Sequence, residues 1–175
     1  YKLQEIDRKY NLLKRGYKIL DLGCAPGSWS KYASQKVGES GLVVGIDKET
    51  VKLENIKNAV FIKHDIFKID LNIIKEICSG FDLILSDMAP STTGTREVDQ
   101  ARSVELVRRA YGIAQEILKN NGHFLCKIFQ GPDMKSFIES IKPNFDWIKI
   151  IKPQGSRSES FETYILGFGY KKSFD

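Results

Sequence analysis

The sequence predicts a doubly wound α/β domain, in which helices cover both faces of a mostly parallel sheet. First, short apolar runs alternate with helical stretches over five successive units. Second, several of these runs stop at an acidic residue, which is typical of strands that end at a ligand-binding edge. Third, a length of 175 residues fits one domain with a full hydrophobic core. We therefore expect residues 1–175 to form a single domain.

The first elements are a helix, a strand and a second helix. Apolar residues recur at a helical spacing near the N-terminus, at Leu3, Ile6, Tyr10 and Leu13. This spacing predicts a helix over residues 3–14. The apolar run 17–22 predicts a strand that closes on Gly23. Residues 28–37 then predict a helix that turns Trp29 inward, so a strand–turn–helix unit opens the sheet.

Three further strands follow, and each stops at or next to an acid. They are expected at residues 42–46, 59–62 and 81–85. In a parallel sheet, ligands gather at the carboxyl ends of the strands. We therefore expect the strand-end acids to converge on one rim: Asp21, Asp47, Asp65 and Asp87.

The last part of the chain departs from strict alternation. The elements expected there are a helix at 97–119, a strand at 123–129, a helix at 134–141, and strands at 147–151 and 163–168. The long helix is expected to stop at Asn120-Asn121-Gly122. No helix separates the last two strands, which predicts an antiparallel hairpin at one edge of a seven-stranded sheet.

The charge pattern permits a polyanionic partner. The net charge is +5, and the basic excess is concentrated in residues 1–18, which hold six basic and two acidic residues. Within it, the predicted N-terminal basic helix 1–16 carries Lys2 and Arg8. This segment is interpreted either as an RNA-facing patch or as a solvated helix face.

Cysteine and histidine usage argues against disulfides and metals. Cys24, Cys78 and Cys126 are odd in number and lie in or beside apolar runs, which predicts free thiols in a reducing compartment. Neither His64 nor His123 stands at a metal-site spacing, so we expect no metal. No apolar run approaches the ~20 residues of a membrane span. A cytoplasmic location is expected, with mitochondria or nucleolus as alternatives in a eukaryote.

The turn at residues 21–27 predicts a nucleoside-type cofactor. Its glycines allow a ligand to approach the backbone, and Asp47, 20 residues beyond Gly27, is placed to bind ribose hydroxyls. A dinucleotide fingerprint would need glycine where Ala25 stands. The turn therefore favours S-adenosylmethionine, with Asp65 near the adenine amino group, over NAD. A surface role for Asp65 stays open.

Lys127 is unusual because it lies in the middle of an apolar strand. A buried lysine is costly unless its charge is paired, so a chemical role is favoured over a solvated position. The neighbouring strand in such a sheet ends at Asp87. We therefore expect these two side chains to lie together.

At these residues the chain resembles the FtsJ (RrmJ) family of ribosomal-RNA ribose 2′-O-methyltransferases. The matching motifs occur in the family's order, at Tyr1-Lys2-Leu3, 21–30, 86–90, Thr93-Gly94, 127–131, Lys152-Pro153 and Glu162-Thr163-Tyr164. The resemblance implies a Rossmann-like methyltransferase fold and a catalytic tetrad of Lys2, Asp87, Lys127 and Glu162. The turn and the strand-end acids together make the expected cofactor site: Asp21, Gly23, Ala25, Pro26, Gly27, Ser28, Trp29, Asp47, Asp65 and Asp87.

The implied reaction moves a methyl group from S-adenosylmethionine to a ribose 2′-oxygen and leaves S-adenosylhomocysteine. A hydroxyl is a poor nucleophile, so Lys127 is expected to accept its proton, with Lys2 nearby, while Asp87 and Glu162 fix the amines and orient the hydroxyl. The expected target is a uridine of large-subunit ribosomal RNA, free or in a pre-ribosomal particle, and Met88 favours that branch of the family.

The RNA is expected to contact Lys2, Arg8 and Arg157. The chain differs from bacterial members at Glu159 and Phe161, where those members carry additional arginines. Alternatives are methylation of transfer RNA or the mRNA cap, a non-catalytic RNA-binding or ribosome-assembly module, and a nucleotide-dependent oxidoreductase. A monomer is expected, because no leftover apolar stripe calls for a partner.

Overall fold

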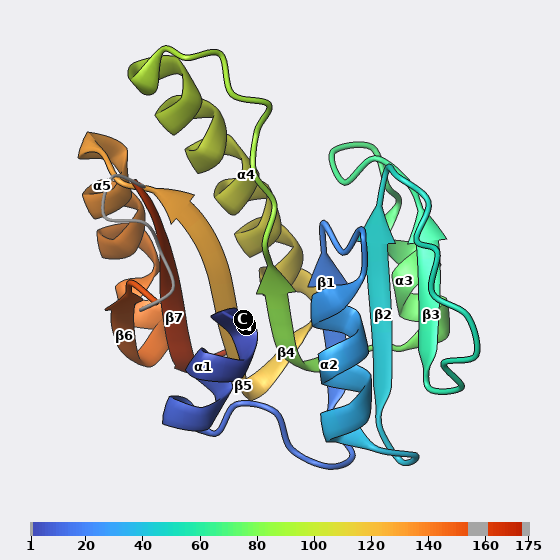
Figure 1. Ribbon diagram of the computed structural model, residues 1–175. Coiled ribbons are helices and arrows are strands. Elements are labelled where there is room, and N and C mark those ends of the chain that lie inside the picture. Colours follow the sequence, from blue (N-terminus) through green and yellow to red (C-terminus); the bar gives the residue numbers. More distant parts are fainter. Residues whose placement is uncertain (1, 154–160, 173–175) are drawn as a thin grey trace.

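A computed structural model of the chain describes residues 2–153 and 161–172, and in these ranges seven strands form one sheet. The strands lie in the order β3-β2-β1-β4-β5-β7-β6 (Figure 1). Their bounds are β1 Lys18–Leu22, β2 Leu42–Asp47, β3 Ala59–Lys63, β4 Phe81–Ser86, β5 Leu118–Phe129, β6 Phe145–Ile151 and β7 Glu162–Tyr170. The helices are α1 Lys2–Tyr10, α2 Ser28–Val37, α3 Leu71–Ile77, α4 Arg96–Ile117 and α5 Pro132–Ile141, with a short 3₁₀ turn at Lys142–Asn144.

The sheet is parallel from β3 to β5 and antiparallel at the other end. β7 pairs antiparallel with β5 on one side and with β6 on the other. The predicted hairpin is therefore confirmed, but its second strand lies inside the sheet and β6 forms the edge. The doubly wound α/β class and the mostly parallel sheet are also confirmed.

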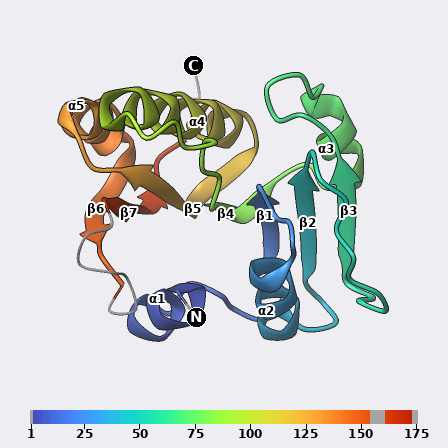
Figure 2. The same cartoon turned by 45° about the horizontal axis from the view of Figure 1, so that its top comes forward.

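Helices cover both faces of this sheet (Figure 2). α1 and α2 lie on one face, and α3, α4 and α5 lie on the other. The hydrophobic core is therefore divided into two parts, one on each face of the sheet. Leu20 and Leu22 of β1 pack into the α4 side, and Ile19, which precedes them, packs into the α1–α2 side. Successive strand residues point to opposite faces, which is why the parallel strands are apolar along their whole length.

Two predicted helix ends were wrong, one because of a local turn and one because of a strand pairing. α1 ends at Tyr10 rather than near residue 14, because Asn11 adopts a positive φ of 52° and Asp7 accepts a hydrogen bond from the Leu13 backbone N–H at 2.8 Å. α4 ends at Ile117 rather than at residue 119. Leu118 already pairs with Phe81 of β4, so the strand begins earlier than the stop signal at residues 120–122 indicates.

Within residues 2–153 and 161–172, no helix is both long and apolar enough to cross a membrane.

Candidate active site

Lys127 and Asp87 are brought together by the register of two neighbouring parallel strands. Ser86, the last residue of β4, pairs with Cys126 of β5, so the residues that follow them lie side by side. Lys127 Nζ lies 3.1 Å from Asp87 Oδ1. The lysine side chain is only 11% exposed, which means that its charge depends on this partner for compensation. The expected proximity of the two side chains is confirmed.

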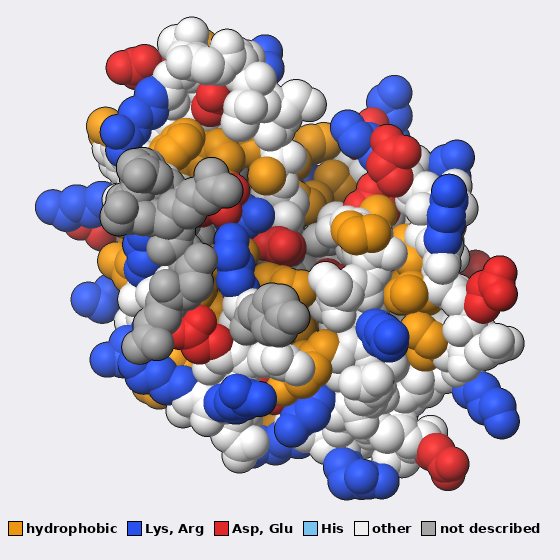
Figure 3. Space-filling view, in the orientation of Figure 1, with side chains coloured by type: hydrophobic (Ala, Val, Ile, Leu, Met, Phe, Trp, Pro, Cys, Tyr) orange, Lys and Arg blue, Asp and Glu red, His pale blue; other side chains and the backbone are white. Residues whose placement is uncertain are grey.

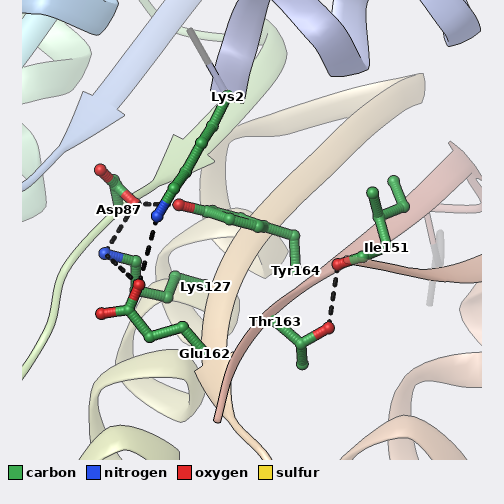
Figure 4. A network of polar contacts seen from close by, with 7 residues as sticks. All are labelled: Lys2, Asp87, Lys127, Ile151, Glu162, Thr163 and Tyr164. Carbon is green, nitrogen blue, oxygen red and sulfur yellow. Dashed lines mark hydrogen bonds and ion pairs between the residues drawn. The ribbon is translucent and has the colours of Figure 1, made fainter. Parts of the chain in front are cut away.

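The network extends to Glu162 and Lys2, which come from the opposite ends of the chain. Lys127 Nζ lies 3.7 Å from Glu162 Oε2, and the same oxygen accepts a hydrogen bond from Lys2 Nζ at 3.3 Å. Figure 4 shows the four side chains pointing toward one another. The structure thus brings together all four residues that the resemblance implied.

Tyr164 is a fifth member of this cluster that sequence reasoning missed. Its hydroxyl donates to Asp87 Oδ1 at 2.7 Å (Figure 4). Burial, and then the Asp87 charge, raise the pKa of this phenol, so it stays a proton donor. The Lys2 ammonium lies 5.9 Å from the centre of its ring. Side chains alternate between the two faces of a strand, so the position of Tyr164, two residues after Glu162, could have predicted that it lies on the same face of β7.

The cluster is open to solvent on one side. The side chains of Asp87 and Glu162 are 29% exposed and that of Lys2 is 35% exposed, whereas Lys127 lies beneath them. In the space-filling view, acidic and basic side chains meet at a hollow near the middle of this face (Figure 3). A substrate group can therefore reach Lys127 from the surface.

A cavity of about 390 Å³ adjoins the cluster at the carboxyl ends of β1, β2, β3 and β4. Asp87 lines it and also belongs to the cluster, so the cavity and the cluster share a wall. Asp47 and Asp65 also line the cavity, and the carboxylate of each already accepts a hydrogen bond from a backbone N–H. Asp47 Oδ2 accepts from the Ala25 N–H at 2.9 Å, and Asp65 Oδ1 accepts from the Phe67 N–H at 2.9 Å.

The expected convergence of four acids on one rim is corrected for Asp21. Three of the acids line the cavity, but Asp21 is fully buried and accepts a 2.6 Å hydrogen bond from the Ser30 hydroxyl. Its other carboxylate oxygen has no hydrogen-bond partner among the described residues. Burial raises the pKa of Asp21 to about 7. This aspartate therefore lies beneath the turn rather than in the cavity.

The turn residues divide between the cavity and a second depression. Gly23 and Ala25 line the cavity, whereas Ser28 and Trp29 line a groove between α1 and α2. Pro26 lines neither. Gly27 precedes α2 and has a φ of 127°, a backbone conformation that residues other than glycine rarely adopt. A Cβ at this position would also collide with the Leu53 side chain.

The remaining residues expected to bind RNA are unevenly placed. Arg8 is exposed near the end of α1, and Arg157 lies outside the described residues. The Arg96 guanidinium lies 5.0 Å from the centre of the Phe161 ring, and Phe161 directly precedes Glu162. Arg96 of α4 therefore places a positive charge beside Phe161, one of the positions at which bacterial members of the family were expected to carry an arginine.

Within residues 2–153 and 161–172, no group of three or more His, Cys, Asp or Glu side chains is arranged to hold a metal ion.

Comparisons with known proteins agree with this geometry. A family model described as FtsJ-like methyltransferase matches residues 1–170. A protein of Desulfatibacillum aliphaticivorans is 45% identical over 98% of this chain and 83% of its own length, and one of Desulfosudis oleivorans is 44% identical over 99% and 84%. Both are named ribosomal RNA large subunit methyltransferase E.

Solved structures share the fold. A Plasmodium falciparum protein described as a ribosomal RNA methyltransferase superposes with a TM-score of 0.86 at 28% identity, over 99% of this chain and 97% of its own. The fibrillarin pre-rRNA processing protein of Methanococcus jannaschii has a TM-score of 0.66 at 17% identity, over 93% of this chain and 70% of its own. At that identity the likeness concerns the fold alone.

Proposed function

Because the chain belongs to the FtsJ-like methyltransferase family and is therefore a methyltransferase, we propose that it methylates a ribose 2′-hydroxyl of RNA with S-adenosylmethionine. The observation that carries this proposal is the Lys2, Asp87, Lys127 and Glu162 cluster beside the cavity. We extend to this chain the substrate in its relatives' names, large-subunit ribosomal RNA, with uridine as the target nucleotide. It would act as a monomeric single domain in the cytoplasm.

The cavity fits the proposed cofactor. Its volume of about 390 Å³ lies in the range of small-molecule sites. Asp47 offers carboxylate oxygens to ribose hydroxyls, and Asp65 offers one to an adenine amino group. The apolar side chains of Phe67 and Met88, which also line the cavity, can lie against a planar base. Gly23 faces Met88 without a Cβ, and a Cβ there would collide with that side chain and narrow the cavity.

The reaction then needs a deprotonated ribose oxygen at the correct place. When bound, S-adenosylmethionine supplies a methyl group on a positively charged sulfur and leaves as S-adenosylhomocysteine. Lys127 accepts the hydroxyl proton at Nζ in its neutral form, and Asp87, which also lines the cavity, and Glu162 then compensate the ammonium charge that results. Glu162 is shared between Lys127 and Lys2, so neither amine holds that carboxylate alone. Asp87 is held by Tyr164 and keeps Lys127 oriented.

The decisive experiment compares wild type with Lys127→Ala on ribosomal RNA, with ribose methylation read by mass spectrometry. We expect the variant to lose activity by roughly 10²–10⁴-fold, the usual contribution of a general base. Calorimetric titration should show that it still binds S-adenosylmethionine, because Lys127 does not line the cavity. A matched control is Lys75→Gln, since Lys75 pairs with Glu116 on the α3–α4 side of the sheet.

The same experiment separates the competing functions. Equal methylation by wild type and Lys127→Ala would remove the catalytic assignment and leave an RNA-binding module. Binding of NAD without binding of S-adenosylmethionine would indicate an oxidoreductase. Transfer RNA and capped RNA, offered as parallel substrates, would show whether the target lies outside the ribosome.

A further inference from the structure

A second depression, with a volume of about 370 Å³, lies between α1 and α2. We call it the α1–α2 groove; its lining comes from Leu3, Gln4, Ser28, Trp29, Lys31, Tyr32 and Gln35. Leu3 and Trp29 are nearly fully buried and form its base, while Lys31 and Gln35 are exposed at its margin. Among the described residues, none lines both this groove and the proposed cofactor cavity.

The groove adjoins the catalytic cluster through two contacts. Leu3 directly follows Lys2 in α1. The Trp29 ring lies 5.8 Å from the ring of Tyr164, whose hydroxyl binds Asp87. The groove therefore adjoins the cluster on the α1–α2 side of the sheet.

The lining has the chemistry of a nucleotide site. Gln4 and Gln35 carry amides that can both donate and accept hydrogen bonds, as a nucleobase edge requires. Lys31 supplies an ammonium for a phosphate. Tyr32 supplies a flat ring, and rings of this kind stack on bases without regard to sequence.

Tyr32 is held in place by a bond that leaves its ring available. Its hydroxyl donates to Asp7 Oδ2 at 2.8 Å. Asp7 is itself buried and also accepts from the Leu13 N–H. The hydroxyl is therefore already satisfied, so Tyr32 contributes to the groove through its ring, which is only partly buried against the core.

The charge of this side of the molecule favours RNA over a protein partner. α1 and α2 together hold five basic and two acidic residues, and one of the two acids, Asp7, is buried. The three basic residues of α1 and the two of α2 thus outweigh one acid at the surface. Such a surface attracts phosphates.

We propose that the α1–α2 groove binds a nucleotide of the substrate RNA that neighbours the methylated one. Its base stacks on Tyr32 between the amides of Gln4 and Gln35, and its phosphate contacts Lys31. The inference rests on the proposed function for the identity of the RNA, because the groove by itself selects only a single-stranded nucleotide.

The test is a pair of variants at Tyr32 in the full chain, assayed on ribosomal RNA. Tyr32→Leu removes the ring, and we expect the RNA dissociation constant and KM to rise about 10-fold, as for the loss of one stacked base. Compared with Tyr32→Phe, which lacks the same bond to Asp7, kcat and the affinity for S-adenosylmethionine should differ by less than about twofold. Tyr32→Phe keeps the ring and loses only the bond to Asp7, so its KM should stay near wild type.

The outcomes are distinct. If Tyr32→Phe raises KM as much as Tyr32→Leu, the residue acts by positioning α1, and the inference is wrong. If neither variant changes RNA affinity, the groove does not bind RNA. Lys31→Gln should lower the salt dependence of binding by about one released counterion, whereas Lys75→Gln on the other face should not.

Failure of the proposed function would look different. Wild-type protein that binds ribosomal RNA without methylating it would overturn the methylation proposal, and the groove would still be judged by the affinities of the two Tyr32 variants. Wild-type protein that binds no RNA would overturn both. If the protein binds RNA, a crosslink between 4-thiouridine in the RNA and residues 28–35 would support the groove whether or not methylation is detected.

Discussion

Single carboxylate oxygens connect the members of the catalytic cluster. Asp87 Oδ1 accepts a hydrogen bond from the Tyr164 hydroxyl and pairs with Lys127 Nζ. Glu162 Oε2 pairs with both Lys127 and Lys2. These contacts form a continuous network from the Tyr164 hydroxyl to Lys2. Each link is shared, so removing one side chain changes the partners of the next.

Tyr164→Phe tests the first link. The variant removes a hydrogen bond to a charged group, which contributes about 1.5–3 kcal/mol. Asp87 then holds Lys127 less firmly, and we expect kcat in single-turnover methylation to fall by roughly 10-fold or more, with little change in RNA affinity.

Thr163→Val is the matched control for Tyr164→Phe. Thr163 lies on the same strand but donates to the Ile151 carbonyl, away from the cluster (Figure 4). It should cost about 1 kcal/mol of folding stability and leave kcat unchanged. Equal effects of the two variants on kcat would mean that the hydroxyl of Tyr164 has no specific role.

Asp21→Asn tests a buried ionisable group. Burial raises the pKa of Asp21 from 3.8 to about 7, so between these values the folded protein holds a proton that the unfolded chain releases. Folding stability contributed by this group therefore falls as pH rises from about 4 to about 7. Asp21→Asn has no proton to lose at this position, so it does not show this loss of stability. Its free energy of unfolding relative to that of wild type should therefore rise with pH, by up to ~1.4 kcal/mol per pH unit.

Urea unfolding of both proteins from pH 4 to 8 measures this difference. The comparison matters because His123, whose pKa burial lowers to about 4, acts in the opposite direction in much of the same range. Its contribution is present in both proteins and cancels. Parallel stability curves for wild type and Asp21→Asn would show that Asp21 titrates normally.

At the scale of elements, α1 matters because it carries Lys2 into the cluster. It covers the sheet through Leu3 and Ile6 and is fastened at its other end by Asp7. The Asp7 carboxylate joins α1 to the following loop through the Leu13 N–H and to α2 through the Tyr32 hydroxyl. A buried acid outside the cluster therefore holds the helix that carries Lys2, a lysine of the proposed catalytic set.

Asp7→Ala should consequently affect both stability and rate. The change leaves two buried donors without a partner, and we expect a loss of roughly 2–4 kcal/mol in unfolding free energy. Because α1 loosens, kcat should fall while S-adenosylmethionine affinity, measured by calorimetry, stays close to wild type. Tyr32→Phe, which removes one of the two bonds, should show a smaller loss of stability. A full loss of cofactor affinity in Asp7→Ala would instead indicate that the whole fold is disturbed.

At the scale of the whole molecule, the sequence predicted the sheet well and the boundaries set by tertiary contacts poorly. Parallel strands buried on both faces are continuous apolar runs, so their positions are visible in the sequence. The pairing of Leu118 with Phe81 depends on a distant part of the chain, so the end of α4 was misplaced. The end of α1 is set by a local turn at Asn11, which the apolar spacing of residues 3–13 does not reveal.

The site was predictable in unequal parts. Lys127 and Asp87 could be inferred physically, because a lysine in an apolar strand needs a partner. Lys2 and Glu162 required the family motifs, since no local pattern links residues 160 positions apart. Tyr164 and the α1–α2 groove arise only when strands and helices are assembled.

A truncation tests how far the fold depends on its last strand. A chain that ends at Ile151 lacks β7, and β6 then has no neighbour, because β7 separates it from β5. We expect this fragment to lose cooperative thermal unfolding and all methylation, whereas a chain that ends at Lys172 keeps every described element and should retain both. Cooperative unfolding of the shorter fragment would show that the parallel half is stable alone.

The contact between Lys2 and Glu162 also has a consequence for the protein's own synthesis. During synthesis Lys2 leaves the ribosome before Glu162, which follows 160 residues later. Throughout that interval the polypeptide lacks part of the proposed reaction centre, so we expect it to be unable to methylate the RNA that surrounds it. Activity then requires β7 to pair between β5 and β6, which couples methylation to the completion of folding.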